Sequence, residues 1–232
     1  MIRILLVAAM LGLSVAAAQA QGIVGDVLSG KLVSPEVGVF AWYDLTDKTE
    51  DKHYYLRQAI VGEEKVKRKK GYWVETEVIP QVGYPAIYRM LLTGPASDPK
   101  NVHRVELQEG RGPVQIIPVD KDAKPEKEPE RASLGTEEVT LADGTKIETE
   151  HLEIKSAGEK TDIWVSDDVP PMGIVRMVSP DGELILRRHG QGGKDGESAI
   201  GRPVPTPESD SGVKVKVGGG VSTNLSIREK AR

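Results

Sequence analysis

The sequence predicts a mainly β protein: a curved antiparallel sheet of the half-barrel type with a short N-terminal helix and a disordered C-terminal tail. Apolar and polar residues alternate with a period of two over most of residues 39–188, and β-branched and aromatic residues are frequent there. Turn-forming Gly, Pro and Asp separate the alternating runs. The 232 residues include no cysteine, so a packed core must hold this sheet together without disulfides.

The first twenty residues have the pattern of a secretory signal peptide. Arg3 supplies a positive charge, an apolar stretch runs from Ile4 to Val15, and small residues end the segment at Ala18-Gln19-Ala20. The apolar stretch is shorter than the ~20 residues that a membrane-spanning helix needs. We therefore expect residues 1–20 to be removed and the mature chain to be exported without a transmembrane segment. The periplasm is the expected location, with an extracellular one as the alternative.

The mature domain is expected to span residues 22–190. It begins with a short helix at 23–33, where apolar residues recur at roughly helical spacing around two glycines. Strands are predicted wherever the period changes to two. They lie at residues 39–45, 53–61, 72–79, 86–93, 103–109, 113–119, 137–154, 161–166 and 173–188.

Two segments have too few apolar residues to join a core. Residues 120–133 are rich in Lys, Glu and Pro, which predicts a solvated loop between the two groups of strands. Residues 191–232 are dominated by Gly, Ser, Pro and charge, which predicts a flexible tail whose one strand-like run is Val213–Val217.

The first Asp-Gly turn predicts its own strand register. A three-residue loop at 142–144, with Gly144 in the left-handed conformation, sets Val139 opposite Ile147. A two-residue turn would instead oppose Val139 to Glu148, so the three-residue loop is favoured.

The same reasoning applied to the second Asp-Gly turn predicts a three-residue loop at 180–182. This loop sets Met177 opposite Ile185 and Val178 opposite Leu184. It also avoids the like-charged pair of arginines that a two-residue turn on Asp-Gly would create.

The adjacent acids Asp167 and Asp168 raise the question of a metal or catalytic site. Neither has a histidine within eight residues on either side, and successive side chains of an extended backbone point to opposite faces, which is poor for joint ligation. The following Pro170-Pro171 excludes a helix. We therefore expect this stretch to be a corner between strands.

No motif in the sequence indicates catalysis, a metal or a cofactor. The four histidines, at positions 53, 103, 151 and 189, are far apart and form no ligand pattern. A G-x-S-x-G motif and a phosphate-binding glycine loop are also missing. The expectation is a non-enzymatic protein without metal or cofactor, although carboxylates from distant strands leave an enzyme as an alternative.

Seven large apolar side chains are candidate ligand-binding residues. Aromatic and Met side chains on strands can line a cavity for an acyl chain or another apolar ligand. The alternative is that they fill an ordinary core, as large aromatics do in most β domains. These residues are Trp42, Trp73, Tyr88, Met90, Trp164, Met172 and Met177.

Residues 65–70 hold five cations between two predicted strands, with Tyr72 and Trp73 immediately after them. Such a basic hairpin could contact anionic lipid headgroups, with the aromatic rings at the interface. The alternative is a solvated hairpin loop whose charge is balanced by neighbouring glutamates.

The order of these segments resembles the exported lipoprotein-localisation-factor (LolA/LolB-like) half-barrel proteins over about residues 22 to 190. That resemblance implies an antiparallel sheet curled around a helical plug, with a concave apolar face that carries lipid or lipoprotein acyl chains. The residues that carry it are Trp164, Val165, Val169, Pro170, Gly173 and the hairpin around Asp181-Gly182.

The expected function is therefore an exported envelope protein that binds a lipid, an acyl chain or a lipoprotein on the concave sheet face. The alternative is a structural or protein-interaction component of the bacterial envelope, with another envelope protein as its partner and no small-molecule ligand. The net charge of −4 gives no indication of a nucleic-acid partner.

Overall fold

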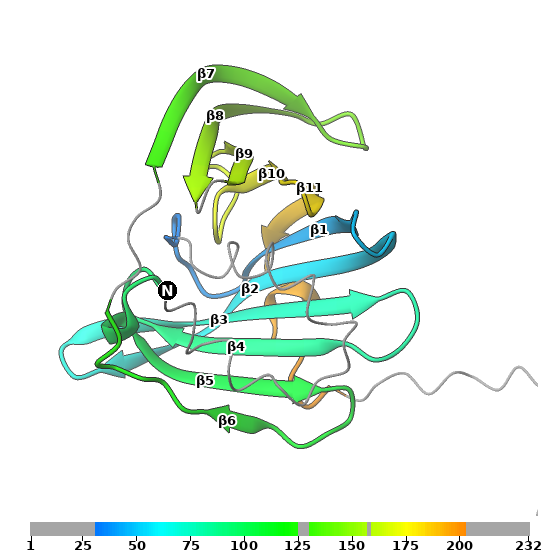
Figure 1. Ribbon diagram of the computed structural model, residues 1–232. Helices are drawn as coiled ribbons and strands as arrows, with labels where there is room; N and C mark the ends of the chain where they lie inside the picture. Colours follow the sequence, from blue (N-terminus) through cyan, green and yellow to red (C-terminus); the bar gives the residue numbers. More distant parts are fainter. Residues whose placement is uncertain (1–30, 125–129, 157–158, 203–232) are drawn as a thin grey trace, which may run out of the picture. The chain divides into compact units, whose positions relative to one another are not determined.

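The computed structural model describes residues 31–124, 130–156 and 159–202 (Figure 1). Its eleven strands form one antiparallel sheet in the order β6-β5-β4-β3-β2-β1-β11-β10-β9-β8-β7. The sheet is open, because β6 and β7 are its two edges. Within these residues the only helical turns are the 3-10 turns η3 (Pro99–Asn101) and η4 (Lys194–Gly196).

The strands in chain order are β1 (Val39–Asp47), β2 (Lys52–Val66), β3 (Lys69–Pro80), β4 (Ala86–Leu92), β5 (Val102–Glu109), β6 (Gln115–Ile117), β7 (Glu130–Thr140), β8 (Lys146–Ser156), β9 (Glu159–Val165), β10 (Ile174–Val178) and β11 (Gly182–Gln191). Each strand predicted from the sequence is present, so the mainly β, antiparallel fold class is confirmed. Half-barrel curvature stays a prediction. The signal peptide, most of the predicted helix at 23–33 and the run Val213–Val217 lie outside the described residues. The last three residues of that predicted helix, 31–33, are not helical.

The topology consists of two antiparallel meanders joined at the centre of the sheet. Strands β1 to β6 follow one another in space, and so do β7 to β11. The last strand, β11, then pairs with the first, β1, over Val39–Asp47. The two ends of the described chain are thereby tied together in the middle of the fold.

The two faces of the sheet differ in chemistry because side chains alternate along each strand and opposite residues share a face. The apolar face carries two cross-strand rows of apolar residues. One row is Leu45, Leu184, Met177, Ile163 and Leu152. The other row is Ile60, Val74, Met90, Val105 and Ile117. The charged face is the opposite one, with the row Phe40, Ala59, Glu75, Arg89, Glu106, Ile116. Two buried apolar clusters form the core, and Leu32 packs against both.

The first Asp-Gly hairpin has the predicted geometry. Val139 pairs with Ile147, and Gly144 has φ +86°, the left-handed conformation that glycine adopts without steric cost. The carboxylate of Asp143 accepts a hydrogen bond from the Thr145 amide at 2.9 Å, which holds the pKa of Asp143 below its ordinary value. The loop is thus closed by the residues that the sequence indicated.

The second Asp-Gly hairpin corrects the predicted register by one residue. Met177 pairs with Leu184 and not with Ile185, and Val178 pairs with Glu183 and not with Leu184. The turn is a two-residue one centred on Pro180-Asp181, closed by hydrogen bonds between Ser179 and Gly182. The physical reason is burial: this register places Met177 and Leu184, both almost completely buried, on the same face.

The loop expected at 120–133 ends earlier than predicted, because β7 begins at Glu130. The first nine residues of β7 are all exposed, and their polar composition therefore suggested a loop. Backbone pairing with β8, in which Arg131 lies opposite Ile154 and Ser133 opposite Leu152, makes this polar segment a strand nevertheless.

Residues 192–202, here called the strap, cross the charged face after β11 ends. In Figure 1 this orange segment runs behind β3, β4 and β5. It meets one polar side chain from each of the first five strands, a continuous series across the sheet. These partners are Trp42, Arg57, Glu75, Arg89 and Gln108.

A buried ion pair lies beneath the strap. The Arg57 and Glu75 side chains are ion-paired and have no exposed surface. The Arg57 guanidinium also donates to Glu77 at 2.9 Å and to the backbone carbonyls of Asp195 and Glu197 at 2.7 and 3.1 Å. A buried charge is tolerated only when its hydrogen-bonding capacity is used, and here the strap backbone supplies the last acceptors.

The strap also completes the hydrogen bonds of the acid. Glu75 accepts from the Ser198 hydroxyl at 2.6 Å and from the Ala199 amide at 2.7 Å. Gly196 permits the close approach that this requires, because a Cβ there would overlap the carbonyl oxygen of Gly38. The packed structure therefore extends to residue 202, beyond the boundary at 190 that the sequence indicated.

Removing the strap should destabilise the sheet strongly. A chain that ends after Gly190 leaves Arg57 without two carbonyl acceptors and Glu75 without two donors, and it exposes the pair to water. We expect its free energy of unfolding to fall by roughly 3 to 5 kcal/mol, because hydrogen bonds to two charged groups are lost. Urea denaturation measures this loss against a chain that ends after Arg202, which keeps every hydrogen bond named above. Equal midpoints for the two chains would contradict the strap's role.

Candidate functional site

The seven candidate ligand-binding residues do not gather in one place, because they are divided between the two faces of the sheet. Trp42, Trp73 and Trp164 lie on the charged face, since their opposite residues are Arg57, Leu91 and Arg176. Tyr88, Met90 and Met177 lie on the apolar face, and Met172 lies in the corner between β9 and β10. Trp164 also packs against the larger buried cluster that contains Met172 and Met177, but the other four residues lie outside that cluster, so the seven do not line one cavity.

The three tryptophans of the charged face are half-buried, and each is covered by a guanidinium. Arg188 lies 5.7 Å from the centre of the Trp42 ring. Arg89 lies 5.0 Å from that of Trp73, and Arg176 lies 5.0 Å from that of Trp164. Each indole N–H donates to a carboxylate, so the polar end of each ring has a partner. Each ring therefore already has a guanidinium and a carboxylate as partners within the chain.

Three of the four candidates on the apolar side belong to or pack against the core clusters. Met172 and Met177 are buried in the larger cluster, and Met90 packs against the smaller one. Tyr88 is half-buried, and burial raises the pKa of its phenol, with the charge of Glu109 adding to the effect.

Three buried polar side chains interrupt the apolar face at its centre. Tyr43, Gln58 and Thr76 have no exposed surface, and we call them the polar trio. Gln58 lies directly opposite Thr76 on β3, and Tyr43 comes from the neighbouring strand β1. Within the described chain, the Tyr43 hydroxyl, both amide atoms of Gln58 and the Thr76 hydroxyl have no hydrogen-bond partner.

Buried polar atoms without partners are rare in folded proteins, since each costs about 1 to 3 kcal/mol. Burial also raises the pKa of Tyr43 far above its ordinary value, so its phenol stays protonated and can donate. The polar trio thus presents donors and acceptors but no charge. Its chemistry suits a neutral carbonyl, ester, amide or hydroxyl group, and not a carboxylate or a phosphate.

Sequence reasoning missed the polar trio, although one signal could have found it. Gln58 stands between Leu56 and Ile60 in the inward phase of β2. Thr76 stands between Val74 and Val78 in the same phase of β3. A polar residue at an inward position of a strand is a local violation of the alternating pattern, and such violations are expected at functional sites.

The Asp167-Asp168 stretch is a corner, as predicted. Both acids are exposed, and the corner is closed by backbone hydrogen bonds from Ser166 to Gly173 at 2.8 Å and from Gly173 to Val169 at 2.7 Å. Val169 is completely buried and anchors the corner in the larger cluster. No group of three His, Cys, Asp or Glu side chains placed to hold a metal ion occurs in the described ranges.

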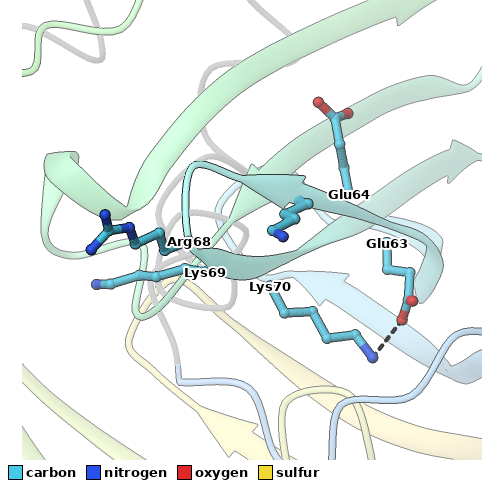
Figure 2. Close-up of a pocket in the computed structure, with 6 residues that line it drawn as sticks. Glu63, Glu64, Arg68, Lys69 and Lys70 are labelled. Carbon is cyan, nitrogen blue, oxygen red and sulfur yellow. Dashed lines mark ion pairs between the residues drawn. The ribbon is translucent and has the colours of Figure 1, made fainter.

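Two of the surface hollows in the described part of the chain are large enough to compare with the candidate residues. One, of about 380 Å³, lies at the β2–β3 hairpin and is lined by Glu63, Glu64, Lys65, Arg68, Lys69 and Lys70 (Figure 2). The other, of about 160 Å³, is lined by Asp44, Leu45, His53, Tyr54, Tyr55 and Gln81. None of the seven candidate residues lines either hollow.

Comparison with known proteins gives no family for this chain. No protein-family model and no curated protein matches it. Among solved structures it is similar to a Bacteroides fragilis protein described as exported and as having a YmcC-like fold. The identity is 10%, the TM-score is 0.36, and 70% of this chain and 100% of that one are covered.

A second similar structure is a protein of Parabacteroides distasonis that is described as a lipoprotein. The identity is again 10%, with a TM-score of 0.39 over 69% of this chain and 99% of that one. Likeness at this level establishes neither a shared fold nor a shared function. The LolA/LolB-like resemblance stays a prediction. No helix among the described residues is long and apolar enough to cross a membrane.

The corner acids should contribute little to stability or to metal binding. We expect the double variant Asp167→Asn, Asp168→Asn to lose at most ~1 kcal/mol, because both side chains are exposed turn residues. Urea denaturation checks the stability, and a calorimetric titration with Ca²⁺ checks binding. Stoichiometric Ca²⁺ binding by the wild type that the variant lacks would show that the corner is a metal site.

The empty hydrogen-bonding capacity of the polar trio has a measurable consequence. Tyr43→Phe removes a buried hydroxyl without a partner, so we expect the ligand-free protein to gain about 1 kcal/mol in free energy of unfolding. Tyr84→Phe is the matched control, because Tyr84 is 67% exposed and the same change there should be nearly neutral. A clear loss of stability in Tyr43→Phe would mean that this hydroxyl is already satisfied within the chain.

Proposed function

We propose that this protein is an exported, non-enzymatic protein of the bacterial envelope that binds an acyl chain or another apolar ligand with a neutral polar group. The ligand lies on the apolar face of the sheet, and its polar group meets the polar trio. The observation that carries this proposal is the set of unpartnered buried atoms on Tyr43, Gln58 and Thr76. Export is supported by the signal-peptide pattern of residues 1–20.

The choice of face follows from the strap. On the charged face the strap crosses β1 to β5 and is hydrogen-bonded to each of them. The tryptophans there are covered by arginines and are no platform for an apolar ligand. The apolar face offers hydrocarbon side chains on both sides of the polar trio, and burial of apolar surface against them stabilises a bound chain by about 25 cal/mol per Å².

Ligand entry requires part of the chain to move, because the polar trio has no exposed surface. Leu32 packs against both apolar clusters, and the Val33 amide donates to the carbonyl of Pro171 at 2.8 Å. Among the described residues, this backbone hydrogen bond and the Leu32 side chain are fewer contacts than the hydrogen bonds that hold the strap. The segment around Leu32 is therefore the side from which a ligand would enter.

The test is to identify what co-purifies with the exported chain. The protein is purified from the periplasmic fraction, and native mass spectrometry is followed by organic extraction and lipid analysis. We expect a stoichiometric lipid with a neutral ester, amide or hydroxyl group. Its occupancy should fall in the variant Tyr43→Phe, Thr76→Val and stay unchanged in the control Tyr84→Phe, Thr136→Val, which alters exposed residues. Repeated absence of any stoichiometric lipid from the wild type would refute the proposal.

A second candidate function, protein interaction without a small-molecule ligand, is favoured by the exposed edge strand β7. This strand runs over Glu130–Thr140 and pairs with β8 along one side only, so its other side presents free backbone N–H and C=O groups. Such an edge can add a strand from a partner. The backbone N–H groups of consecutive residues point to opposite edges of a strand, and proline has no N–H. Of the two variants Thr136→Pro and Glu137→Pro, one should therefore remove an N–H on the free edge only, and the other should remove one on the edge that faces β8. If this function holds, the free-edge variant loses a periplasmic partner while the sheet stays folded.

A further inference from the structure

The tip of the β2–β3 hairpin concentrates positive charge at one end of the sheet. Val66 pairs with Lys69, so Lys67 and Arg68 form the turn, and Lys67 adopts a left-handed backbone with φ +55°. All four cations from Lys65 to Lys69 are exposed. Figure 2 shows the Arg68 and Lys69 side chains extending beyond the turn and away from the two glutamates. We call Lys65, Lys67, Arg68 and Lys69 the basic tip.

The neighbouring acids do not neutralise the basic tip, because two carboxylates stand beside five cations and neither forms an ion pair with the tip. Glu63 is ion-paired with Lys70 at 2.5 Å. Glu64 accepts a hydrogen bond from the indole of Trp73 at 3.3 Å. Across the described ranges, no carboxylate forms an ion pair with the basic tip. The alternative expected from the sequence, a loop balanced by its own glutamates, accounts for Lys70 alone.

A second segment brings another cation to the same end. Lys121 donates to the carbonyl of Val102 at 2.7 Å, and its Nζ lies 3.3 Å from His103. The pKa of His103 is lowered first by burial and then by the charges of Lys121, Lys67 and Lys69. Lys121 and the basic-tip residues Lys67 and Lys69 are thus all close enough to His103 to affect its charge. Asp120 and Asp122 flank Lys121 in the chain, so the uncompensated charge is that of the basic tip itself.

We propose that the basic tip is a docking surface for the anionic phosphate headgroups of a phospholipid membrane. Lys side chains are flexible point charges that suit a diffuse array of phosphates, and the tip has no buried donors that would build a discrete phosphate site. A nucleic acid would need an extended basic surface, whereas this chain has a net charge of −4 and the excess is confined to one hairpin. This inference does not rest on ligand binding at the apolar face.

The location of the basic tip suits this role. Lys70, which follows the basic tip in the chain, lies 5.2 Å from the centre of the Tyr72 ring, so an aromatic side chain lies close to the tip. Aromatic rings favour the headgroup level of a membrane, while the charges reach the phosphates. The tip is an end of the sheet, so docking there leaves both faces unobstructed.

Co-sedimentation with vesicles tests the proposal. The full mature chain is mixed with phosphatidylcholine vesicles that contain or lack phosphatidylglycerol, at low and at high salt. We expect binding to the anionic vesicles only, and weaker binding at high salt because exposed charges are screened. The variant Arg68→Gln, Lys69→Gln should bind about 30-fold more weakly, since each cation near an anionic surface contributes about fivefold.

The matched control is Lys48→Gln, Lys155→Gln, which changes the net charge equally at exposed lysines elsewhere and should bind like the wild type. Equal binding to both kinds of vesicle, or equal weakening in the two variants, would overturn the proposal. Competition by dilute inorganic phosphate would also overturn it, because it would indicate a discrete phosphate site. Lipid extraction tests ligand binding at the apolar face, whereas vesicle co-sedimentation tests membrane docking by the basic tip. Either result can be negative without affecting the other.

Discussion

The buried ion pair between Arg57 and Glu75 is the constraint on which the rest of the structure depends. Two charges buried on the charged face of central strands cannot be left without partners, since an uncompensated buried charge costs several kcal/mol. Glu77 supplies part of the compensation and the strap supplies the rest through its backbone. A face that would otherwise be open is therefore closed by residues distant in sequence from the strands that they cover.

This closure is the reason why we place the proposed apolar ligand on the other face. With the strap across β1 to β5, the apolar face is the one on which hydrogen-bonding capacity is left unused. The polar trio of Tyr43, Gln58 and Thr76 is costly in a ligand-free core, and apolar residues of similar size would remove the cost. Local violations of this kind are expected where function opposes stability. The division between a sealed charged face and a costly apolar face is the physical basis of the proposed function.

Alternation of apolar and polar residues was sufficient to predict the strands, because a half-buried strand imposes a period of two on its own sequence. The first Asp-Gly hairpin was predictable for the same reason, whereas the second slipped by one residue. Its register depends on which face buries Met177 and Leu184, and short-range turn rules contain no such information.

The strap and the site could not be predicted in the same way. Composition describes side chains, but the strap is held largely by its backbone carbonyls and amides, which any sequence possesses. The seven candidate residues were chosen by type, and type alone does not say which face a residue occupies. Trp42 and Tyr88 therefore entered one candidate site although they lie on opposite faces.

Amide hydrogen exchange at Ala199 tests the central claim, that the strap permanently seals the charged face, most directly. The Ala199 amide donates to the buried Glu75 carboxylate at 2.7 Å, so it can exchange only when the strap leaves the sheet. If the claim is right, the protection of Ala199 should approach that of the central amides of β2 and β3. Rapid exchange at Ala199 in a protein whose β2 and β3 amides stay protected would contradict it, because the strap would then open while the sheet stays folded. The charged face, with its tryptophans, would then be accessible, and the argument for binding on the apolar face would fail.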